Sequence, residues 1–343
     1  MNAIATSDFE YVLPPDLIAQ VPIAERSASR LLVVTRPDGE REDRRFGDLA
    51  DLVPPGDLVI LNSTKVRHAR LLGTRPSGAP AEVLLIHPAG DGTWIALGQP
   101  GSAMKVGRRI NLGAGFEVET VEILDGPHRR VRFLGGTAEA AMARLGRLPL
   151  PPYIDRAPTP EDDHRYQTVF AEREGSVAAP TAGLHFTESL LGRLEASGAR
   201  IGKLDLEVGP GTFRPVEVAD PRRHVIHRES YTITPELVAA VAATRRAGHH
   251  IWAVGTTVVR ALESAADADG ALTAGRRDTE LLILPGFRFR IVDRLITNFH
   301  LPRSTLLMLV TAFGGREAIQ GAYRHAIESR YRFYSYGDAM LIR

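Results

Sequence analysis

The second half of the chain repeats one order of segments: a short apolar run, a polar loop, then a stretch with apolar residues at helical spacing. The apolar runs after Val177, which we interpret as strands, cover 201–208, 251–254 and 280–284. The predicted helices cover 187–198, 235–247, 257–267 and 305–329. A helix between two strands lets the second strand run in the same direction as the first. This order therefore predicts an α/β fold with a mostly parallel sheet and flanking helices.

The chain between Leu71 and Phe133 has a different pattern, in which short runs of alternating apolar residues are separated by turn residues. The runs that suit strands are 82–86, 93–97, 116–121 and 130–133. Short strands at this spacing predict a small antiparallel β-barrel. Apolar runs at 29–34 and 57–62 come earlier and suit further strands of the main sheet. We therefore expect a discontinuous main α/β domain at 1–70 and 148–343, with the barrel domain inserted at 71–147.

The composition narrows the class of protein. The 343 residues are 44% hydrophobic and 24% charged, which suits one large or two modest globular domains. A formal net charge of +1 neither demands nor excludes a nucleic-acid partner. The chain contains no cysteine, which excludes disulfides, thiolate nucleophiles and cysteine-ligated zinc. The N-terminus has no signal-peptide pattern and no apolar run is long enough to span a membrane, so we expect a cytoplasmic protein.

The segment Pro180–Thr187 lies between an apolar run and a predicted helix, and Thr187 suits the N-cap of that helix. Thr181, Gly183 and His185 would share one loop at the carboxyl end of a strand, where open α/β sheets bind ligands. The structural alternative is a helix cap beside a buried histidine that makes only local hydrogen bonds. Both interpretations stay open on this motif alone.

A second motif is a predicted strand, a Gly255-Thr256-Thr257 turn and a helix. The free N–H groups at the start of that helix, two hydroxyls and Arg260 one turn later would form a cradle for a carboxylate or phosphate. The structural alternative is a capped helix in which Arg260 forms a surface pair with Glu263.

A third motif, Thr297–Pro302, precedes the longest apolar run, Leu306–Phe313, which we predict as a buried helix. Asn298 can both donate and accept hydrogen bonds, and His300 can exchange a proton near neutral pH. The alternative is a turn in which these two side chains bond to the local backbone.

Two further patterns suggest different functions. His224, His227 and Glu229 allow a metal site, but no further His or Cys follows at a suitable spacing and we expect no metal. Leu204–Phe213 is similar to the first motif of an S-adenosylmethionine-dependent methyltransferase, an acidic strand end followed by Gly-x-Gly. Phe213 replaces the third glycine of that motif, and Pro215 opposes an immediate helix.

The tail at 331–338 interleaves aromatic residues with arginine. Such a mixture can stack on RNA bases and hold phosphates, and it could equally be a docked terminal strand. Together with basic residues near the start of the chain, the candidates for RNA binding are Lys65, Arg70, Arg332 and Tyr336.

Taken together, these motifs resemble those of the S-adenosylmethionine:tRNA ribosyltransferase-isomerase family of queuosine biosynthesis. The resemblance runs almost from end to end, and the set is highly specific although any single motif is a weak signal. The segments that carry it are Leu61–Val66, Pro180–Thr187, Gly211–Val216, His227 with Glu229 and Tyr231, Val254–Thr257, Thr297–Pro302 and Ser335–Met340.

The resemblance implies an α/β domain with an inserted β-barrel, and a reaction in which S-adenosylmethionine donates its ribosyl group. The acceptor would be the aminomethyl group of 7-aminomethyl-7-deazaguanine at the wobble position of tRNA. Adenine and methionine would leave, and isomerisation of the ribose would give epoxyqueuosine. S-adenosylmethionine is then a co-substrate, tRNA is the partner, and no true cofactor, metal or membrane is expected. We also expect a monomer.

This reaction needs a base that removes a proton next to the sulfonium, and an acid that protonates adenine would help it leave. We assign His185 and His300 to these catalytic roles, because a histidine can act either way near pH 7. Thr256, Thr257 and Arg260 would hold the methionine carboxylate or a tRNA phosphate. The remaining expected substrate-binding residues are Thr181, Gly183, Asn298 and Glu229.

Glu207 departs from the family pattern, which usually has a histidine at this position. This difference leaves open a paralogue with a different acceptor. Two competing functions also stay open, an S-adenosylmethionine-dependent RNA methyltransferase and a non-catalytic RNA-binding protein.

Overall fold

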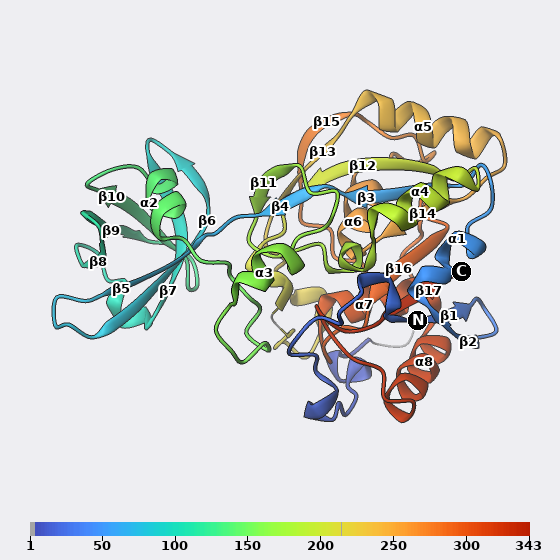
Figure 1. The fold of residues 1–343 in the computed structure, drawn as a ribbon, viewed down its shortest axis with the longest axis horizontal. Helices are drawn as coiled ribbons and strands as arrows, with labels where there is room; N and C mark the ends of the chain where they lie inside the picture. Colours follow the sequence, from blue (N-terminus) through green and yellow to red (C-terminus); the bar gives the residue numbers. More distant parts are fainter. Residues whose placement is uncertain (1–3, 214) are drawn as a thin grey trace.

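The computed structural model describes residues 4–213 and 215–343, and it shows a large α/β domain from which a smaller antiparallel sheet projects (Figure 1). Within this described part, the main sheet has nine strands in the order β15-β13-β12-β3-β14-β16-β17-β1-β2. Their bounds, in that order, are Gly275–Thr279, Glu229–Ile233, Arg200–Leu206, Leu58–Asn62, Ile251–Val254, Arg294–Asn298, Ala339–Ile342, Arg30–Thr35 and Glu40–Arg45.

The centre of the main sheet is parallel, as the alternation of strands and helices predicts. β12, β3, β14 and β16 all run in one direction. β17 and β1 pair in parallel with each other and run opposite to β16. The pairings of β13 with β12 and β15, and of β2 with β1, are antiparallel. The carboxyl ends of four strands therefore meet at one edge, together with the segments that lead into β17 and β1.

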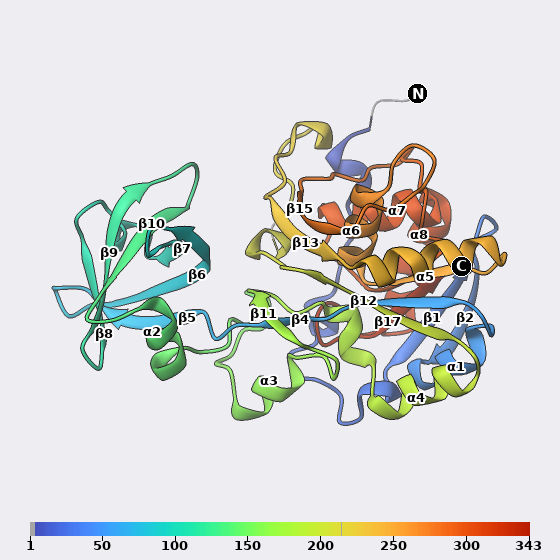
Figure 2. The same ribbon diagram turned by 90° about the horizontal axis from the view of Figure 1, so that it is seen from above.

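Helices cover both faces of this sheet (Figure 2). One face carries α5 (Pro235–Arg246), α6 (Thr256–Ala265), α7 (Thr305–Gly314) and α8 (Arg316–Glu328), and the other carries α1 (Leu49–Leu52) and α4 (Glu188–Ala196).

Strand β3 explains this layered arrangement. Leu58 and Ile60 pack into the first apolar core, whereas Val59 and Leu61 pack into the second, and all four are almost completely buried. Burial of each such side chain contributes about 1.5–3 kcal/mol. A strand that is apolar on both faces is therefore most stable between two helical layers.

The inserted segment forms a six-stranded antiparallel sheet in the order β10-β7-β6-β5-β8-β9, and β9 also pairs with β10. The bounds in that order are Arg129–Leu134, Thr93–Gln99, Pro80–Gly90, Arg70–Thr74, Arg109–Gly113 and Phe116–Ile123. With α2 (Ala138–Leu145), these strands enclose an apolar core of their own. The chain returns through α3 (Pro160–Arg165) and β11 (Arg173–Ser176), which pairs in parallel with β4 (Thr64–Val66).

Three segments differ from the sequence-based expectations or resolve them. The strand predicted at 280–284 is wrong, because the ladder with β13 is formed by the preceding residues of β15. The helix predicted at 305–329 is two helices, which separate where Gly315 adopts a φ of 85°, a conformation that favours glycine. The tail at 331–338 is a loop rather than a docked strand, with one isolated bridge between Phe333 and Ile18, and it leads into the buried strand β17 between β16 and β1.

Candidate active site

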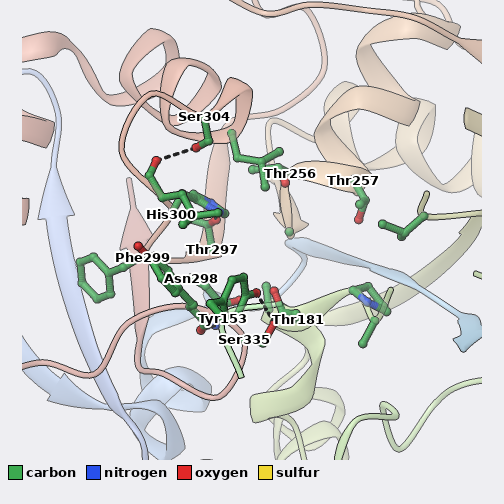
Figure 3. A pocket seen from close by; sticks show the side chains of 18 residues that line it. Tyr153, Thr181, Thr256, Thr257, Thr297, Asn298, Phe299, His300, Ser304 and Ser335 are labelled. Carbon is green, nitrogen blue, oxygen red and sulfur yellow. Dashed lines mark hydrogen bonds between the residues drawn. The ribbon is translucent and has the colours of Figure 1, made fainter. Parts of the chain in front are cut away.

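A hollow of about 610 Å³, including its open mouth, lies at the edge of the main sheet where the parallel strands end. Open α/β sheets bind ligands at this edge. The side chains that surround the hollow come from the ends of β14 and β16, the loop before β17 and the 3-10 turn η6 (Thr181–His185) (Figure 3). Its polar lining residues are Tyr153, Thr181, Thr256, Thr257, Thr297, Asn298, His300, Ser304, Tyr334 and Ser335.

The start of α6 forms one wall. Gly255, with a φ of 92°, turns the chain from β14 into the helix, so that Thr256 and Thr257 face the hollow. No side chain in the described part of the chain caps this helix, which leaves N–H groups of its first turn open to a ligand. The helix dipole adds a partial positive charge at the same place. This wall therefore suits an anionic group.

The end of β16 and the loop after it form another wall. The side chains of Thr297 and His300 bond to each other, with 2.7 Å between Oγ1 and Nε2. The hydroxyl of Tyr323 accepts from the backbone N–H of His300 at 2.9 Å, and the hydroxyl of Tyr11 donates to its carbonyl. Burial lowers the pKa of His300 to about 3, so its imidazole is neutral at pH 7.

The turn η6 brings only one of its three predicted site residues to the hollow. Thr181 lines it, whereas Gly183 packs so closely that a Cβ would lie 2.8 Å from both Phe170 and Thr168. His185 lies behind the wall, where its Nε2 is 3.2 Å from the amide nitrogen of Asn298. Gly183 therefore allows close packing, and His185 reaches the hollow only through Asn298.

His185 is neutral at physiological pH. Its burial, followed by the nearby charges of Arg26 and Arg332, lowers its pKa to about 3. Its ring stacks on Phe46 with 4.9 Å between centroids. A charged imidazolium would lose hydration and gain no anionic partner from these neighbours.

Arg260 and Glu229 meet each other rather than the hollow. The guanidinium of Arg260 bonds to one oxygen of the Glu229 carboxylate, and both side chains are at least nine-tenths buried. The second carboxylate oxygen accepts the backbone N–H of Gly209 at 3.0 Å. Nε of Arg260 donates to the carbonyl of Leu281 at 3.1 Å, while its Nη2 has no partner in the described residues. The structural alternative, a surface pair of Arg260 with Glu263, is therefore wrong.

The four residues predicted to bind RNA are scattered. Lys65 is partly exposed and pairs with Glu174 at 3.1 Å. Arg70 lines a groove between the insert and the main domain. Arg332 donates to a backbone carbonyl, and Tyr336 is buried with its hydroxyl 2.7 Å from Asp162. Because its ring is packed in the interior, Tyr336 cannot stack on a base in this conformation.

Several residues around the hollow were not singled out from the sequence. Tyr334 and Ser335 line it from the loop before β17, and the hydroxyl of Tyr153 is 2.7 Å from that of Ser335. The interleaved aromatic tail was the available signal, because it marked the segment without indicating which face it would present.

Three sequence-based hypotheses can now be compared with the geometry. Glu207 does not line the hollow; its carboxylate is 2.9 Å from the guanidinium of Arg276. The glycines after β12 lead into the 3-10 turn η7 (Pro210–Phe213), not the α-helix of a dinucleotide-type motif. In residues 4–213 and 215–343, no group of three or more His, Asp or Glu side chains could hold a metal ion. No helix of the same residues is long and apolar enough to cross a bilayer.

Comparisons with known proteins identify the relatives of this chain. The family model for queuosine biosynthesis proteins matches residues 6–342. An S-adenosylmethionine:tRNA ribosyltransferase-isomerase of Azoarcus sp. is 52% identical, with 99% of this chain and 97% of the relative covered. The enzyme of the same name from Moorella thermoacetica is 51% identical, with 98% of each chain covered.

A solved structure agrees with these relatives. The crystal structure of an S-adenosylmethionine tRNA ribosyltransferase from Thermotoga maritima is 35% identical, with a TM-score of 0.56. The match covers 98% of this chain and all of the matched chain. The chain therefore belongs to the family of queuosine biosynthesis proteins that includes these S-adenosylmethionine:tRNA ribosyltransferase-isomerases.

Proposed function

We propose that this protein transfers the ribosyl group of S-adenosylmethionine to tRNA and isomerises it. The acceptor is the aminomethyl group of 7-aminomethyl-7-deazaguanine at the wobble position, and the product is epoxyqueuosine. One observation carries the proposal beyond family membership: a single hollow joins an uncapped helix start, at Thr256 and Thr257, to the neutral His300. An anion cradle that shares a hollow with a neutral imidazole suits a zwitterionic sulfonium that must lose a proton.

The hollow supports a division of roles. The start of α6 holds the methionine carboxylate through its N–H groups and the hydroxyls of Thr256 and Thr257. His300 takes the C5′ proton that the sulfonium makes acidic, since its neutral imidazole lines the hollow. Thr181 and Asn298 orient the sugar or the modified base. Methionine and adenine leave as the amine attaches to C1′ and the epoxide closes.

Arg260 and Glu229 support the cradle from behind. Their ion pair joins α6 to β13, and the second oxygen of Glu229 holds Gly209 at the start of the neighbouring loop. We infer that the pair keeps the first turn of α6 in place and that neither residue contacts the carboxylate directly.

We infer that residues 71–147 form a separate barrel domain and that tRNA lies along the groove beside it. This groove has about 1660 Å³ of open space, and Arg70 and Arg147 line it where the chain enters and leaves the insert. Arg70 is partly neutralised by Glu82 at 2.7 Å, whereas Arg147 is exposed. Arginines contribute to tRNA binding by holding phosphates. Lys65 and Arg332, the other two basic candidates, do not line this groove.

The proposed reaction also bears on the cofactors, the oligomeric state and the location of the protein. S-adenosylmethionine is consumed as a co-substrate, and the proposed steps need no metal or additional cofactor. We also propose that the protein acts as a monomer in the cytoplasm, where tRNA is modified.

Incubation of the protein with S-adenosylmethionine and tRNA that carries the deazaguanine precursor tests this function. We expect free adenine and methionine in equal amounts, and epoxyqueuosine in the nucleoside digest by mass spectrometry. A matched tRNA with unmodified guanine at the wobble position should release no adenine. Formation of S-adenosylhomocysteine would instead indicate a methyltransferase. Binding of tRNA without consumption of S-adenosylmethionine would indicate an RNA-binding protein.

A further inference from the structure

Asn298, the last residue of β16, lines the hollow although it is only 2% exposed. Its amide nitrogen is 3.2 Å from the carbonyl oxygen of Tyr334 and 3.2 Å from Nε2 of His185. A carbonyl can only accept a hydrogen bond, so the atom next to Tyr334 must be the amide nitrogen. Both amide hydrogens are then used, and Oδ1 has no partner among the described residues.

The same bond determines the state of His185. Because Asn298 donates to Nε2, that nitrogen carries no hydrogen, and the neutral ring must carry its hydrogen on Nδ1. Nδ1 lies 2.7 Å from the hydroxyl oxygen of Ser29, which can accept this hydrogen. The hydroxyl of Ser29 in turn points to the carbonyl of Arg26 at 3.2 Å. In this series of hydrogen bonds, each donor therefore has an acceptor. All the bonds donate in the same direction, from Asn298 through His185 and Ser29 to the carbonyl of Arg26.

The surroundings of His185 favour this neutral form. Phe46 stacks on the ring, Arg26 and Arg332 contribute positive charge, and burial removes water. Protonation of Nε2 would also place an N–H against the amide hydrogens of Asn298. The site is thus built to supply an uncharged acceptor at Nε2.

We propose that His185 is a positioning residue: it holds the amide of Asn298 so that Oδ1 faces the hollow and accepts a hydrogen bond from substrate. Reversal of the amide would set Oδ1 against the carbonyl of Tyr334 and present a donor to the hollow instead. The identity of the substrate rests on the proposed function. On its substrates, the suitable donors are the ribose hydroxyls, the adenine amino group and the aminomethyl group.

Three variants separate positioning from proton transfer. His185→Gln keeps an uncharged acceptor near the place of Nε2, whereas His185→Phe keeps a stacked ring without it. We expect His185→Gln to retain kcat/KM for S-adenosylmethionine within about threefold and to keep the shape of the pH profile. His185→Phe and Asn298→Ala should each lose about 10- to 100-fold, with tRNA affinity unchanged. The His185→Phe/Asn298→Ala double variant should be no worse than Asn298→Ala alone.

The contrary results are equally clear. If His185→Gln is as inactive as His185→Phe, or loses one limb of the pH profile, His185 transfers protons and the proposal fails. A merely structural role would lower the melting temperature of all His185 variants without recovery of activity in His185→Gln.

A readout independent of turnover keeps the two proposals distinguishable. In nitrogen-15 NMR of histidine-labelled protein, the signal that His185→Gln removes should belong to a neutral ring with its hydrogen on Nδ1. A hydrogen on Nε2 would overturn the positioning role. Failure of the wild-type protein to release adenine would overturn the proposed function, while this spectrum still decides the role of His185.

Discussion

The buried pair of Arg260 and Glu229 allows the sharpest test of how the site is built. Removal of one partner leaves the remaining charge buried and unpaired, which typically costs about 3–5 kcal/mol. Both side chains are at least nine-tenths buried, so solvent screens them little. Arg260→Met should therefore lower the free energy of unfolding by about 3–5 kcal/mol, a large part of the roughly 5–15 kcal/mol typical of proteins.

The matched variant is Glu229→Gln, which can still accept the N–H of Gly209 but leaves the guanidinium of Arg260 unpaired. We expect a loss somewhat below that of Arg260→Met, since one hydrogen bond survives. The Arg260→Met/Glu229→Gln double variant should be more stable than the sum of the two losses predicts, by about 2 kcal/mol. The midpoint and slope of urea unfolding, read at pH 7.5, give these free energies.

Substrate binding decides between the two roles of the arginine. If Arg260 supports the start of α6 from behind, the folded fraction of Arg260→Met should have nearly the wild-type KM for S-adenosylmethionine. An unchanged urea midpoint together with a rise in KM of about a hundredfold would refute this reasoning. Arg260 would then bind the carboxylate itself, as its position one turn into the helix first suggested.

Three further changes have defined outcomes. Gly183→Ala should destabilise the protein by about 1–3 kcal/mol in urea unfolding, because its methyl group would press on Phe170; an unchanged midpoint would show that the turn yields freely. His300 takes up a proton near pH 6.5 in the unfolded chain but only at about pH 3 in the folded chain. The free energy of unfolding should therefore fall as the pH drops below about 6.5, by up to about 1.4 kcal/mol per pH unit. His300→Gln should reduce that slope, and an identical slope would contradict the shifted pKa. Tyr336→Phe should lower the free energy of unfolding by about 1–3 kcal/mol, because it leaves an oxygen of buried Asp162 with one hydrogen bond fewer. The affinity for tRNA in filter binding should not change. Weaker binding would support the RNA contact that the sequence predicted for Tyr336.

Local patterns predicted much of the fold because they depend on neighbours in the chain. The run at 251–254 is strand β14, and the Gly-Thr-Thr turn after it does start a helix at the edge of the sheet. The change in pattern at Leu71 marks the antiparallel insert. In each case, alternation or helical spacing of apolar residues records which side of one element is buried.

Contacts between distant parts of the chain decide further features. No local pattern shows that β17 would fit between β16 and β1, or that the aromatic tail would be buried. The alternative pair of Arg260 with Glu263 used a neighbour in the chain, whereas in the fold Arg260 pairs with Glu229, 31 residues earlier. Which buried charges pair with each other depends on which side chains the completed sheet brings together.

The sequence by itself determined the family, the parallel centre of the sheet, and the presence of Thr256, Asn298 and His300 near strand ends, whereas Thr181 lies in the 3-10 turn η6. Only the tertiary structure decided that these four side chains surround one hollow while His185 lies behind it. The physical reason is that the period of a strand or helix determines which way a side chain points relative to its own element. Whether that direction leads to a cavity or to another side chain depends on elements more than a hundred residues away.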